Sequence, residues 1–489
     1  MSRINTNVSS LIAQRTLGSQ NLGLNKSLQR LSTGLRINRG ADDPAGLIAS
    51  ENLRSEKAAI NSAITNAERA EQVVNVAEGG LQEVSNLLVE LQSLVSSTAN
   101  EAGVSDEEKA ANQLQIDSIL QTIDRIANST SFQGEKLLNG NFDYDTSFQT
   151  SALTDITVNA AKLSDDGSAL DVTVEVLQSA ATADVFLSTG STFTNGDNGS
   201  ITVEVTGTRG TQQFTFASGT AQSDIIAAVN SFAEQTGVSA SQVSTGGNIE
   251  LSSTDYGSDS FVRVKTLSNE GTAIVSDELA DTPTNNAVTG SGRDATVLIN
   301  GTSATTDGLT ARVSNEGLDI SITLTADMNT GANAGSGSTT ISITGGGADF
   351  NLAQDVSLAS KVSLGIETVT TGNLGSGSNG FLSDLKSGGA ANVTNGDLSK
   401  AQRVIDDSIK QVSSLRGRLG AFQKNVVGAT ISSLGVALEN TAAAESQIRD
   451  TDFAAETAAL TRGQILQQAA IQSLSLANSG PQAVLSLLG

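Results

Sequence analysis

The sequence predicts an α+β protein in which helices from both chain ends pair as a long antiparallel coiled-coil rod and carry an inserted β-rich region. Apolar residues recur with a seven-residue period between Leu53 and Thr98, and again between Ile405 and Val436. From residue 141 the period changes to two, and Ser, Thr, Gly and Asn become frequent. A seven-residue repeat is typical of helices that supercoil around one another, whereas a two-residue period is typical of strands.

The first heptad series fills two of every seven positions, three residues apart. Its members are Leu53, Ile60, Ala67, Val74, Leu81, Leu88 and Val95, with Ala63, Ala70, Ala77, Val84, Leu91 and Thr98. A sustained period of 3.5 predicts a left-handed supercoil against another helix. One long helix of an ordinary bundle is the alternative, but helices of globular proteins rarely exceed about 25 residues.

The second heptad series supplies the partner from the other end of the chain. Its members are Ile405, Val412, Leu419, Val426 and Ser433, with Ser408, Leu415, Phe422, Ala429 and Val436. If the two series pack together, the chain between them becomes an insertion at one end of the rod, and the termini meet at the other. The expected seam contacts are Ile60, Val74, Leu81, Leu88, Val412, Leu419, Phe422 and Val426.

Helix start and stop signals divide the rest of the chain. Asp43 is a favourable N-cap and Pro44 a favourable first helical residue, so a helix should begin there. We expect helices over 44–100, 105–128, 397–447 and from 454, with Gly480-Pro481 kinking the last one. Three parts follow: terminal helices in 1–43 with 450–489, a helical rod with short β turns in 44–180 with 360–449, and an inserted region in 181–359.

The inserted region reads as β-rich. Strand patterns at 201–205, 213–216, 248–253 and 261–265 flank a helical pattern at 223–234, which predicts a ββαββ unit within 199–270. A second β block follows, with strands at 296–301, 318–325 and 339–344 and a hairpin turn at Asn300-Gly301. The Gly/Ser-rich stretches 331–338 and 374–380 are candidates for disordered linkers.

The composition of the chain excludes most kinds of catalytic and metal-binding site. The chain has no His and no Cys, which removes imidazole bases and ligands, thiolate metal sites and Cys nucleophiles. Asp42-Asp43 and Asp406-Asp407 sit near expected helix starts, where acids favour the helix dipole. The glycines at 345–347 lack the lysine of a phosphate-binding loop. We therefore expect no enzyme activity, cofactor or metal.

The net charge of the chain argues against nucleic-acid binding. The net charge is -24, and residues 141–396 hold 28 acidic and 8 basic residues, or -20 of it. An acidic insertion opposes nucleic-acid binding and suits a solvated outer surface. No apolar run is long enough for membrane insertion, and the N-terminus lacks the apolar core of a cleaved signal peptide.

The terminal helices carry more apolar surface than one molecule can bury. The expected polymerisation residues are Ile4, Val8, Leu11, Leu24, Leu28, Leu31, Ile465, Leu466, Leu474 and Leu476. Residues 1–41 hold six basic residues and no acidic one, so a helix lying on a membrane surface is an alternative. The face lacks bulky aromatic residues, which favours packing on protein, and neighbouring copies of the chain are the expected partner.

Several segments resemble bacterial flagellin. They are INTNVSSLIAQRTL (4–17), NRGADDPAGL (38–47), LRGRLGAFQKN (415–425) and the whole stretch 440–489. The resemblance covers about 1–140 and 398–489, and 199–270 resembles an insert of some flagellins and hook-associated proteins. It implies a subunit of the extracellular flagellar filament, with residues 1–36 and 454–489 as inner helices. It also implies export by the flagellar type III route without a cleaved signal. The implied partners are an export chaperone, the filament cap and hook-associated proteins.

The resemblance also bears on the innate immune receptor that the family contacts through its long helix and the next one. Leu94 matches a contact position, but Glu90 stands where the family has Arg, and Gln115 where it has Glu. We therefore expect weakened receptor recognition. A hook–filament junction protein and a surface coiled-coil adhesin are the alternative functions. A zinc protease in the insertion, as in some flagellins, would need His.

Overall fold

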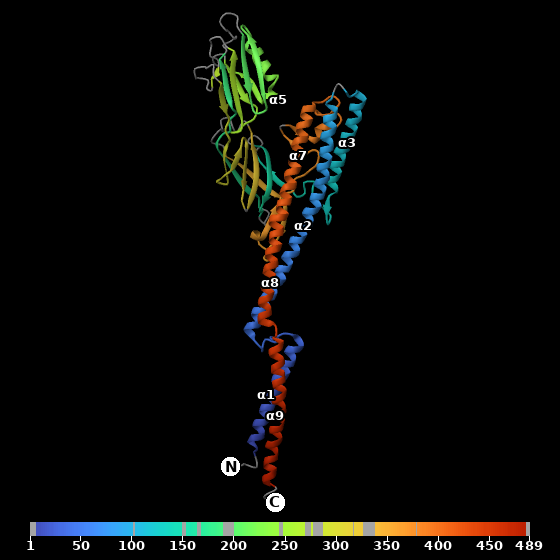
Figure 1. Ribbon diagram of the computed structural model, residues 1–489, viewed down its shortest axis with the longest axis vertical. Coiled ribbons are helices and arrows are strands. Elements are labelled where there is room, and N and C mark those ends of the chain that lie inside the picture. Colours follow the sequence, from blue (N-terminus) through green and yellow to red (C-terminus); the bar gives the residue numbers. More distant parts are fainter. Residues whose placement is uncertain are drawn as a thin grey trace. The chain divides into compact units, whose positions relative to one another are not determined.

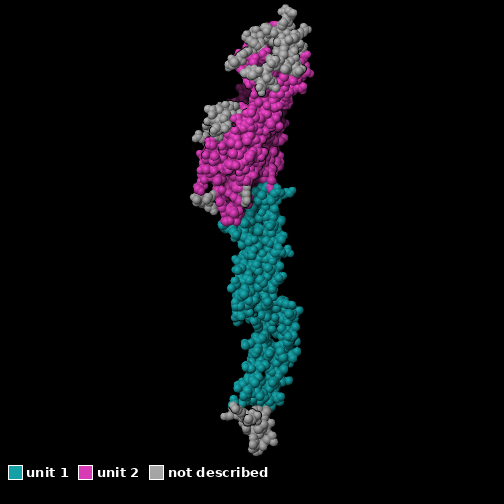
Figure 2. Space-filling model, turned by 90° about the vertical axis from the view of Figure 1, so that its left-hand side faces the viewer, with its two compact units in different colours: residues 1–71, 351–356, 422–489 teal, residues 72–350, 357–421 magenta. Residues whose placement is uncertain are grey.

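The computed structural model describes most of the chain. The described residues are 6–100, 103–148, 153–163, 168–188, 200–243, 248–268, 275–276, 287–315, 317–325, 338–377 and 379–485. They belong to two compact units, residues 1–71, 351–356 and 422–489 in the first and residues 72–350 and 357–421 in the second (Figure 2). Each unit is described by itself.

The first unit is helical. It contains α1 (Val8–Thr33), the start of α2 (Pro44–Thr98), α8 (Gly428–Arg449) and α9 (Phe453–Leu485). α2 begins where its cap predicts: Asp43 Oδ1 accepts a hydrogen bond from the Gly46 amide at 2.9 Å. α9 is capped in the same way by Asp452, which accepts from the amides of residues 454 and 455. α9 remains helical across Pro481, the position at which the sequence predicts a kink.

Within this unit α2 and α8 run antiparallel. Lys57 pairs with Glu445 at 2.6 Å, and Glu51 pairs with Arg449 at 3.0 Å. Between these helices, the buried Ile60 and Ala63 pack with Leu434.

The linker before α2 is held to the linker after α8. Leu35 and Asp450 form an antiparallel bridge, and the Thr451 amide donates to the Gly34 carbonyl at 2.9 Å. A 2.8 Å ion pair joins Lys26 to Asp42, and the hydrogen bond from Lys26 lowers the pKa of Asp42. The stretch 34–43 is therefore an ordered connection despite its two glycines.

The second unit contains the rest of α2, α3 (Asp106–Ser129) and α7 (Leu398–Ala421), with α2 between the other two (Figure 1). The Thr98 hydroxyl accepts from Asn112 of α3 at 3.0 Å, and Arg416 of α7 donates to Glu78 of α2 at 2.8 Å. Every heptad position of α2 from Ile60 to Thr98 is at most 2% exposed.

One rod-seam position is wrong, and a π turn explains it. Residues Phe422–Val427 form a π helix between α7 and α8. A π turn bonds residue i to i+5 and so takes up one more residue than an α turn. Val426, expected in the seam, is half-buried, and Val427 is buried in its place. The shift persists, since Leu434 is buried and the expected Ser433 is exposed.

Irregular chain between residues 366 and 397 is fixed between α3 and α7. Gln411 of α7 bonds both the amide and the carbonyl of Gly375, at 2.9 and 2.6 Å. Asp117 of α3 accepts from the Ser387 amide; burial opposes ionisation of Asp117, but bonds from Ser387 and Gln113 lower its pKa. The described part of 374–380 is thus ordered, not a disordered linker, while 331–337 lies outside the described residues.

Asp406 and Asp407 lie well inside α7, not near its start. Asp406 accepts from Gln92 of α2, and Asp407 accepts from Ser376 and Asn379. These two carboxylates therefore anchor the elements around α7, where we had expected them to serve the helix dipole.

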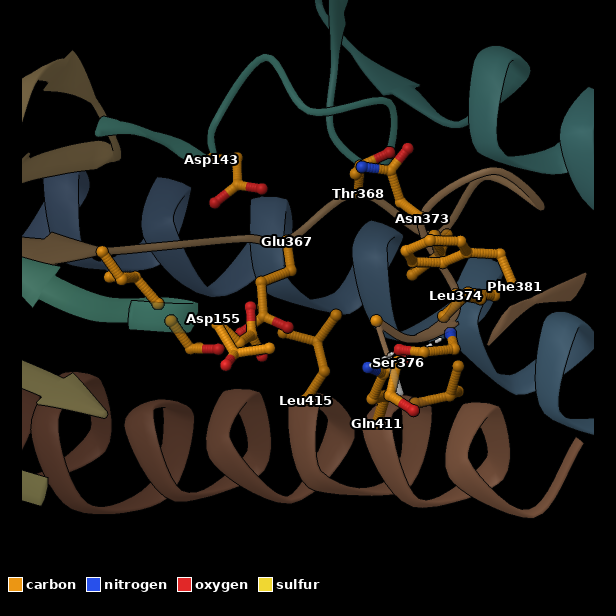
Figure 3. Close-up of a pocket in the computed structure, with 17 residues that line it drawn as sticks. Asp143, Asp155, Glu367, Thr368, Asn373, Leu374, Ser376, Phe381, Gln411 and Leu415 are labelled. Carbon is orange, nitrogen blue, oxygen red and sulfur yellow. Dashed lines mark hydrogen bonds between the residues drawn. The ribbon is translucent and has the colours of Figure 1, made fainter. Parts of the chain in front are cut away.

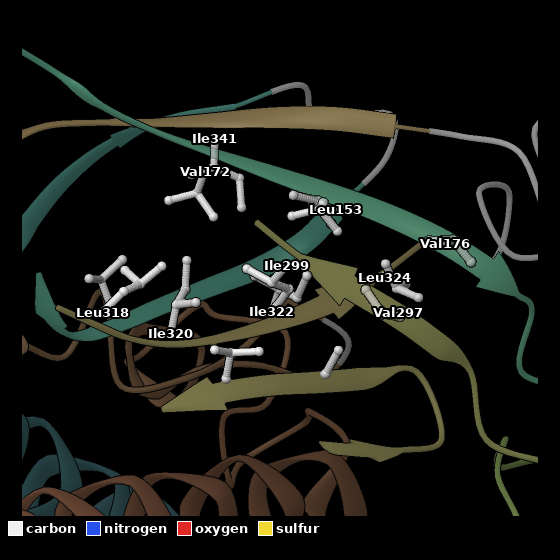
Figure 4. Packing of buried hydrophobic residues seen from close by; sticks show 14 of the residues in the cluster. Leu153, Val172, Val176, Val297, Ile299, Leu318, Ile320, Ile322, Leu324 and Ile341 are labelled. Carbon is white, nitrogen blue, oxygen red and sulfur yellow. The ribbon is translucent and has the colours of Figure 1, made fainter. Parts of the chain in front are cut away.

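A first β domain packs two antiparallel sheets over one aliphatic core (Figure 4). One sheet has the order β15-β14-β5-β19-β3 and the other β16-β17-β18-β4. The strands are β3 (Tyr144–Ser147), β4 (Leu153–Ala161), β5 (Leu170–Gln178), β14 (Thr296–Ile299), β15 (Thr302–Ser303), β16 (Thr305–Asp307), β17 (Thr310–Ser314), β18 (Leu318–Leu324) and β19 (Ser338–Gly346). Asn300 and Gly301 have positive φ, as the predicted hairpin turn requires.

The expected boundary at residue 180 divides this sheet. β5 lies before it, yet β5 pairs with β14 and β19, which come more than a hundred residues later. β4 likewise pairs with β18. Residues 144–178 therefore belong with the β region, and our assignment of them to the helical rod missed β3, β4 and β5.

A second β domain is inserted between β5 and β14. Its sheets have the orders β12-β6-β10-β9 and β13-β11-β7-β8. Its elements are β6 (Asp184–Ser188), β7 (Ser200–Thr206), β8 (Thr211–Ala217), α4 (Gln222–Asn230), α5 (Ala233–Thr236), β9 (Val238–Gln242), β10 (Asn248–Ser253), β11 (Phe261–Ser268), β12 (Val275–Ser276) and β13 (Val288–Ser291). The four predicted strands and the helix are present as β7, β8, α4, β10 and β11, but the prediction missed β9, which lies between the helix and β10. β10 pairs with β9 and β6, whereas β11 pairs with β7, so the second predicted pair is divided between the two sheets.

Two short 3-10 helices, η2 (Leu358–Ser360) and η3 (Leu382–Leu385), and three short strand pairs complete the described elements. The strand pairs are β1 (Ser131–Phe132) with β2 (Glu135–Lys136), β20 (Ala348–Asn351) with β21 (Lys361–Leu364), and β22 (Gly375–Ser376) with β23 (Gly380–Phe381).

Deleting Asn425 should remove the π turn without loss of stability. The deletion restores an uninterrupted heptad, so Leu419 and Leu434 both stay in the seam. Circular dichroism melting should give a midpoint close to that of the parent. Deleting the exposed Ser413 is the control: it moves Leu415, Leu419 and Phe422 out of phase, and exposing each such side chain costs about 1.5–3 kcal/mol. Equal destabilisation by both deletions would contradict the role given to the π turn.

Candidate functional site

The candidate site is the outer surface of the α1–α9 pair. The two helices run antiparallel: Asn7 Nδ2 donates to the Ala477 carbonyl at 2.8 Å, and Gln467 Nε2 donates to Asn21 Oδ1 at 2.6 Å. Arg30 and Glu456 form an ion pair at the opposite end, at 3.5 Å. These contacts fix which faces of α1 and α9 meet.

The seam between α1 and α9 is narrow because its side chains are small. The buried residues of the two helices are Ser10, Ala13 and Ser27 on α1 and Ala470 on α9. Leu24 approaches Gly463, where an added Cβ would lie 4.0 Å from the Leu24 Cδ1. Small side chains bring the helices close but remove little apolar surface from water.

The large apolar side chains therefore divide between half-buried and exposed positions. Of the expected polymerisation residues, three are half-buried beside the seam: Leu24, Leu31 and Leu474. Six are between 44% and 75% exposed: Val8, Leu11, Leu28, Ile465, Leu466 and Leu476. Ile4 lies outside the described residues.

Four further apolar residues share this outward exposure, and sequence reasoning missed them. They are Ile12, Leu22, Phe453 and Ile471, each at least 51% exposed. Ile12 lies four residues after Val8, and Ile471 lies three residues before Leu474, so helical spacing could have found these two. For Leu22 and Phe453 the sequence signal is an apolar residue type on a terminal helix. Exposed apolar patches of this kind mark interaction surfaces on soluble proteins.

The positions matched to the immune receptor lie in the second unit. Glu90 and Gln115 are exposed, on α2 and α3, and Leu94 is half-buried. The exposed apolar side chains Val89 and Leu114 are the sequence neighbours of Glu90 and Gln115.

The described residues offer little for catalysis or metal binding. Within the described ranges there is no group of three or more Asp or Glu side chains placed to hold a metal ion. In the same ranges no helix is both long and apolar enough to cross a membrane.

A cavity of about 320 Å³ is lined by Asp143, Asp155 and Glu367 (Figure 3). Burial raises the pKa of Asp143, while Glu367 is paired with Arg418 at 3.0 Å.

Comparison with known proteins identifies the family. Residues 4–143 match the bacterial flagellin N-terminal helical region, residues 403–488 match the C-terminal helical region, and residues 192–255 match the flagellin hook IN motif. Flagellin B of Vibrio cholerae is 30% identical over 487 residues, covering 99% of both chains. B-type flagellin of Pseudomonas aeruginosa is 31% identical over 512 residues, again covering 99% of both. The chain belongs to the bacterial flagellin family.

Flagellin is a structural protein, and this flagellin is a subunit that self-assembles into the extracellular filament used for swimming. Full-length similarity to proteins named flagellin favours this function over a hook–filament junction protein or an adhesin.

Proposed function

We propose that this flagellin polymerises through the outward apolar face of the α1–α9 pair. The observation that carries the proposal is the division of side chains on these helices. Small and polar residues fill the intramolecular seam, while Leu11, Ile465 and Leu476 remain in water. At about 25 cal/mol per Å², covering such side chains with a second copy supplies a favourable free energy that the monomer lacks.

The remaining parts of the chain then have distinct roles. Residues 1–43 with 450–489 form the inner contacts, the helices of 44–180 with 360–449 form the next layer, and the acidic 181–359 faces the medium. The net charge of -20 over 141–396 supports the last assignment, since like charges on neighbouring copies repel and stay solvated. Residues 144–178 share a sheet with later strands, so in this scheme they go with the β region.

We also propose that the subunit leaves the cell through the flagellar type III route without a cleaved signal. Its partners on the way and in the filament are an export chaperone, the filament cap and hook-associated proteins. The support is the resemblance of the terminal segments to flagellins and the N-terminal stretch 1–41, which has no acidic residue.

Substitutions on the outward face should weaken assembly without unfolding the subunit. Ile465→Gln with Leu476→Gln replaces two side chains that are 62% and 75% exposed, so the monomer should fold normally. Losing two buried contacts of about 1–2 kcal/mol each should raise the critical concentration for polymerisation at least tenfold. Light scattering and electron microscopy of seeded monomer measure it.

Two controls accompany the double variant: one should leave assembly unchanged, and the other should abolish it. Leu267→Gln makes the same kind of change at an exposed leucine of β11 and should leave the critical concentration unchanged. Removing residues 454–489 should give a soluble protein that forms no filaments. Normal filaments from the truncated chain, or an unchanged critical concentration in the double variant, would refute the proposed surface.

The second β domain should be dispensable for assembly. Ala181 and Arg293 are bridge partners joined by N–H···O bonds of 2.9 and 3.1 Å, so a short Gly-rich turn can replace residues 182–292. We expect filaments of this variant by electron microscopy. Replacing 185–355 instead removes β14, β18 and β19 and leaves β4 and β5 without partners, so that variant should aggregate. Failure of the 182–292 variant to polymerise while remaining folded would assign required contacts to this domain.

Glu90 should weaken recognition by the innate flagellin receptor. An Arg at an interface can form a charge-assisted pair of about 1.5–3 kcal/mol, whereas Glu90 cannot donate and repels a facing carboxylate. A reporter-cell assay should show at least tenfold stronger signalling for Glu90→Arg with Gln115→Glu than for the parent. Both positions are exposed, so the variant should fold as the parent does. Equal signalling would show that the contact is not transferred to this chain.

A further inference from the structure

A second cavity of the second unit has the opposite charge to its surroundings. It encloses about 330 Å³ between α7 and the face of sheet β16-β17-β18-β4 that points away from the aliphatic core. Side chains alternate between the two faces of a strand, so polar Thr157, Arg312 and Ser321 line the cavity while their neighbours enter the core. From α7, the polar side chains of Lys410, Ser414 and Arg418 line the cavity together with the apolar Leu415.

Three cations line this cavity, and each retains donors. Arg312 uses Nε and Nη2 on Asp319, at 3.2 and 3.0 Å, and its Nη1 makes no hydrogen bond to the described residues. Arg418 uses Nη2 on Glu367 and the Gly365 carbonyl, while its buried Nε has no partner within the described part of the chain. Lys410 is 78% exposed and lies 3.9 Å from Asp407.

The nearby carboxylates are already engaged. Asp319 is bound by Arg312 and Asn159, and Asp407 accepts from Ser376 and Asn379. Glu367 is the acidic residue that lines the cavity itself, and it is paired with Arg418. The free hydrogen-bonding capacity of the cavity therefore consists mainly of donors, in a segment whose net charge is -20.

We propose that this cavity binds a small oxyanion, namely a phosphate or sulfate group. A tetrahedral oxyanion presents acceptors in several directions, which suits guanidinium and ammonium donors converging from two elements. It would pair with Lys410, the least engaged of the three cations, and with the Nη1 group of Arg312. The hydroxyls of Thr157, Ser321 and Ser414 also line the cavity and would bind the hydroxyls of a sugar that carries the phosphate.

The test is calorimetric titration of inorganic phosphate and of sulfate into the full-length monomer, at an ionic strength held constant with chloride. We expect saturable binding of one anion per chain and a matching, saturable rise in the thermal midpoint. Lys410→Gln should weaken binding at least tenfold. The control, Lys424→Gln, removes the same charge from an exposed lysine outside the cavity and should leave binding unchanged.

Sulfate and phosphate also stabilise proteins generally by exclusion from their surface, but that effect does not saturate. A linear, non-saturating response, or an equal response of the two lysine variants, would overturn the proposal. A hexose 6-phosphate titrated in parallel separates the two sources of the anion. Tighter binding than inorganic phosphate would assign the site to a sugar-borne phosphate, and equal or weaker binding to the free anion.

Discussion

The buried seam of α2 is the constraint on which the rest of the structure depends. From Ile60 to Thr98 its heptad positions are closed to water, and a single helix cannot bury such a stripe by itself. In the first unit the seam begins with Ile60 and alanines, which lets α8 pack closely through Leu434. In the second unit it carries larger side chains such as Leu81 and Leu88, and α3 and α7 lie on either side of it. The chain must therefore return to α2 after a long excursion, which makes the β domains an insertion.

The π turn shows that burial against the α2 seam determines which residues of the second heptad series face α2. The second heptad series contains one residue too many between Phe422 and Val427, and a continuous α-helix would turn everything after it away from α2. A π turn absorbs the residue at the expense of some hydrogen-bond geometry. Keeping Val427 and Leu434 buried outweighs that loss, since each large aliphatic side chain left in water forfeits about 1.5–3 kcal/mol.

The terminal helices differ from α2 in that small side chains form their seam and large apolar side chains remain exposed. Their seam is built from Ser10, Ala13, Ser27 and Ala470, so pairing α1 with α9 fixes their faces without consuming the leucines and isoleucines. The proposed polymerisation surface is what remains. A subunit that buried all of its terminal apolar side chains within one molecule would gain no further burial by joining a filament, and it would stay monomeric.

The sequence by itself determined the features that depend on local geometry. The α2 seam, the cap at Asp43 and the Asn300-Gly301 hairpin follow from helical period, side-chain capping and tolerance of positive φ. Each of these is set within a few residues of chain. The resemblance to flagellins was also evident from the sequence, because the matching segments lie in the helical ends of the chain. Six of the outward apolar residues were among the expected polymerisation residues, whereas Ile12, Leu22, Phe453 and Ile471 were not, and the sequence did not show which residues face the partner helix.

Only the tertiary structure decided the non-local choices. β5 pairs with β14 and β19 across more than a hundred residues, and its alternating pattern fits several neighbours equally well. The phase of α8 depended on where the extra residue was absorbed, which the heptads on either side do not specify. The cationic cavity gathers Arg312, Lys410 and Arg418 from a sheet and a helix that meet only in the folded chain. In each case the deciding free energy comes from burial or charge between distant segments, which no local pattern encodes.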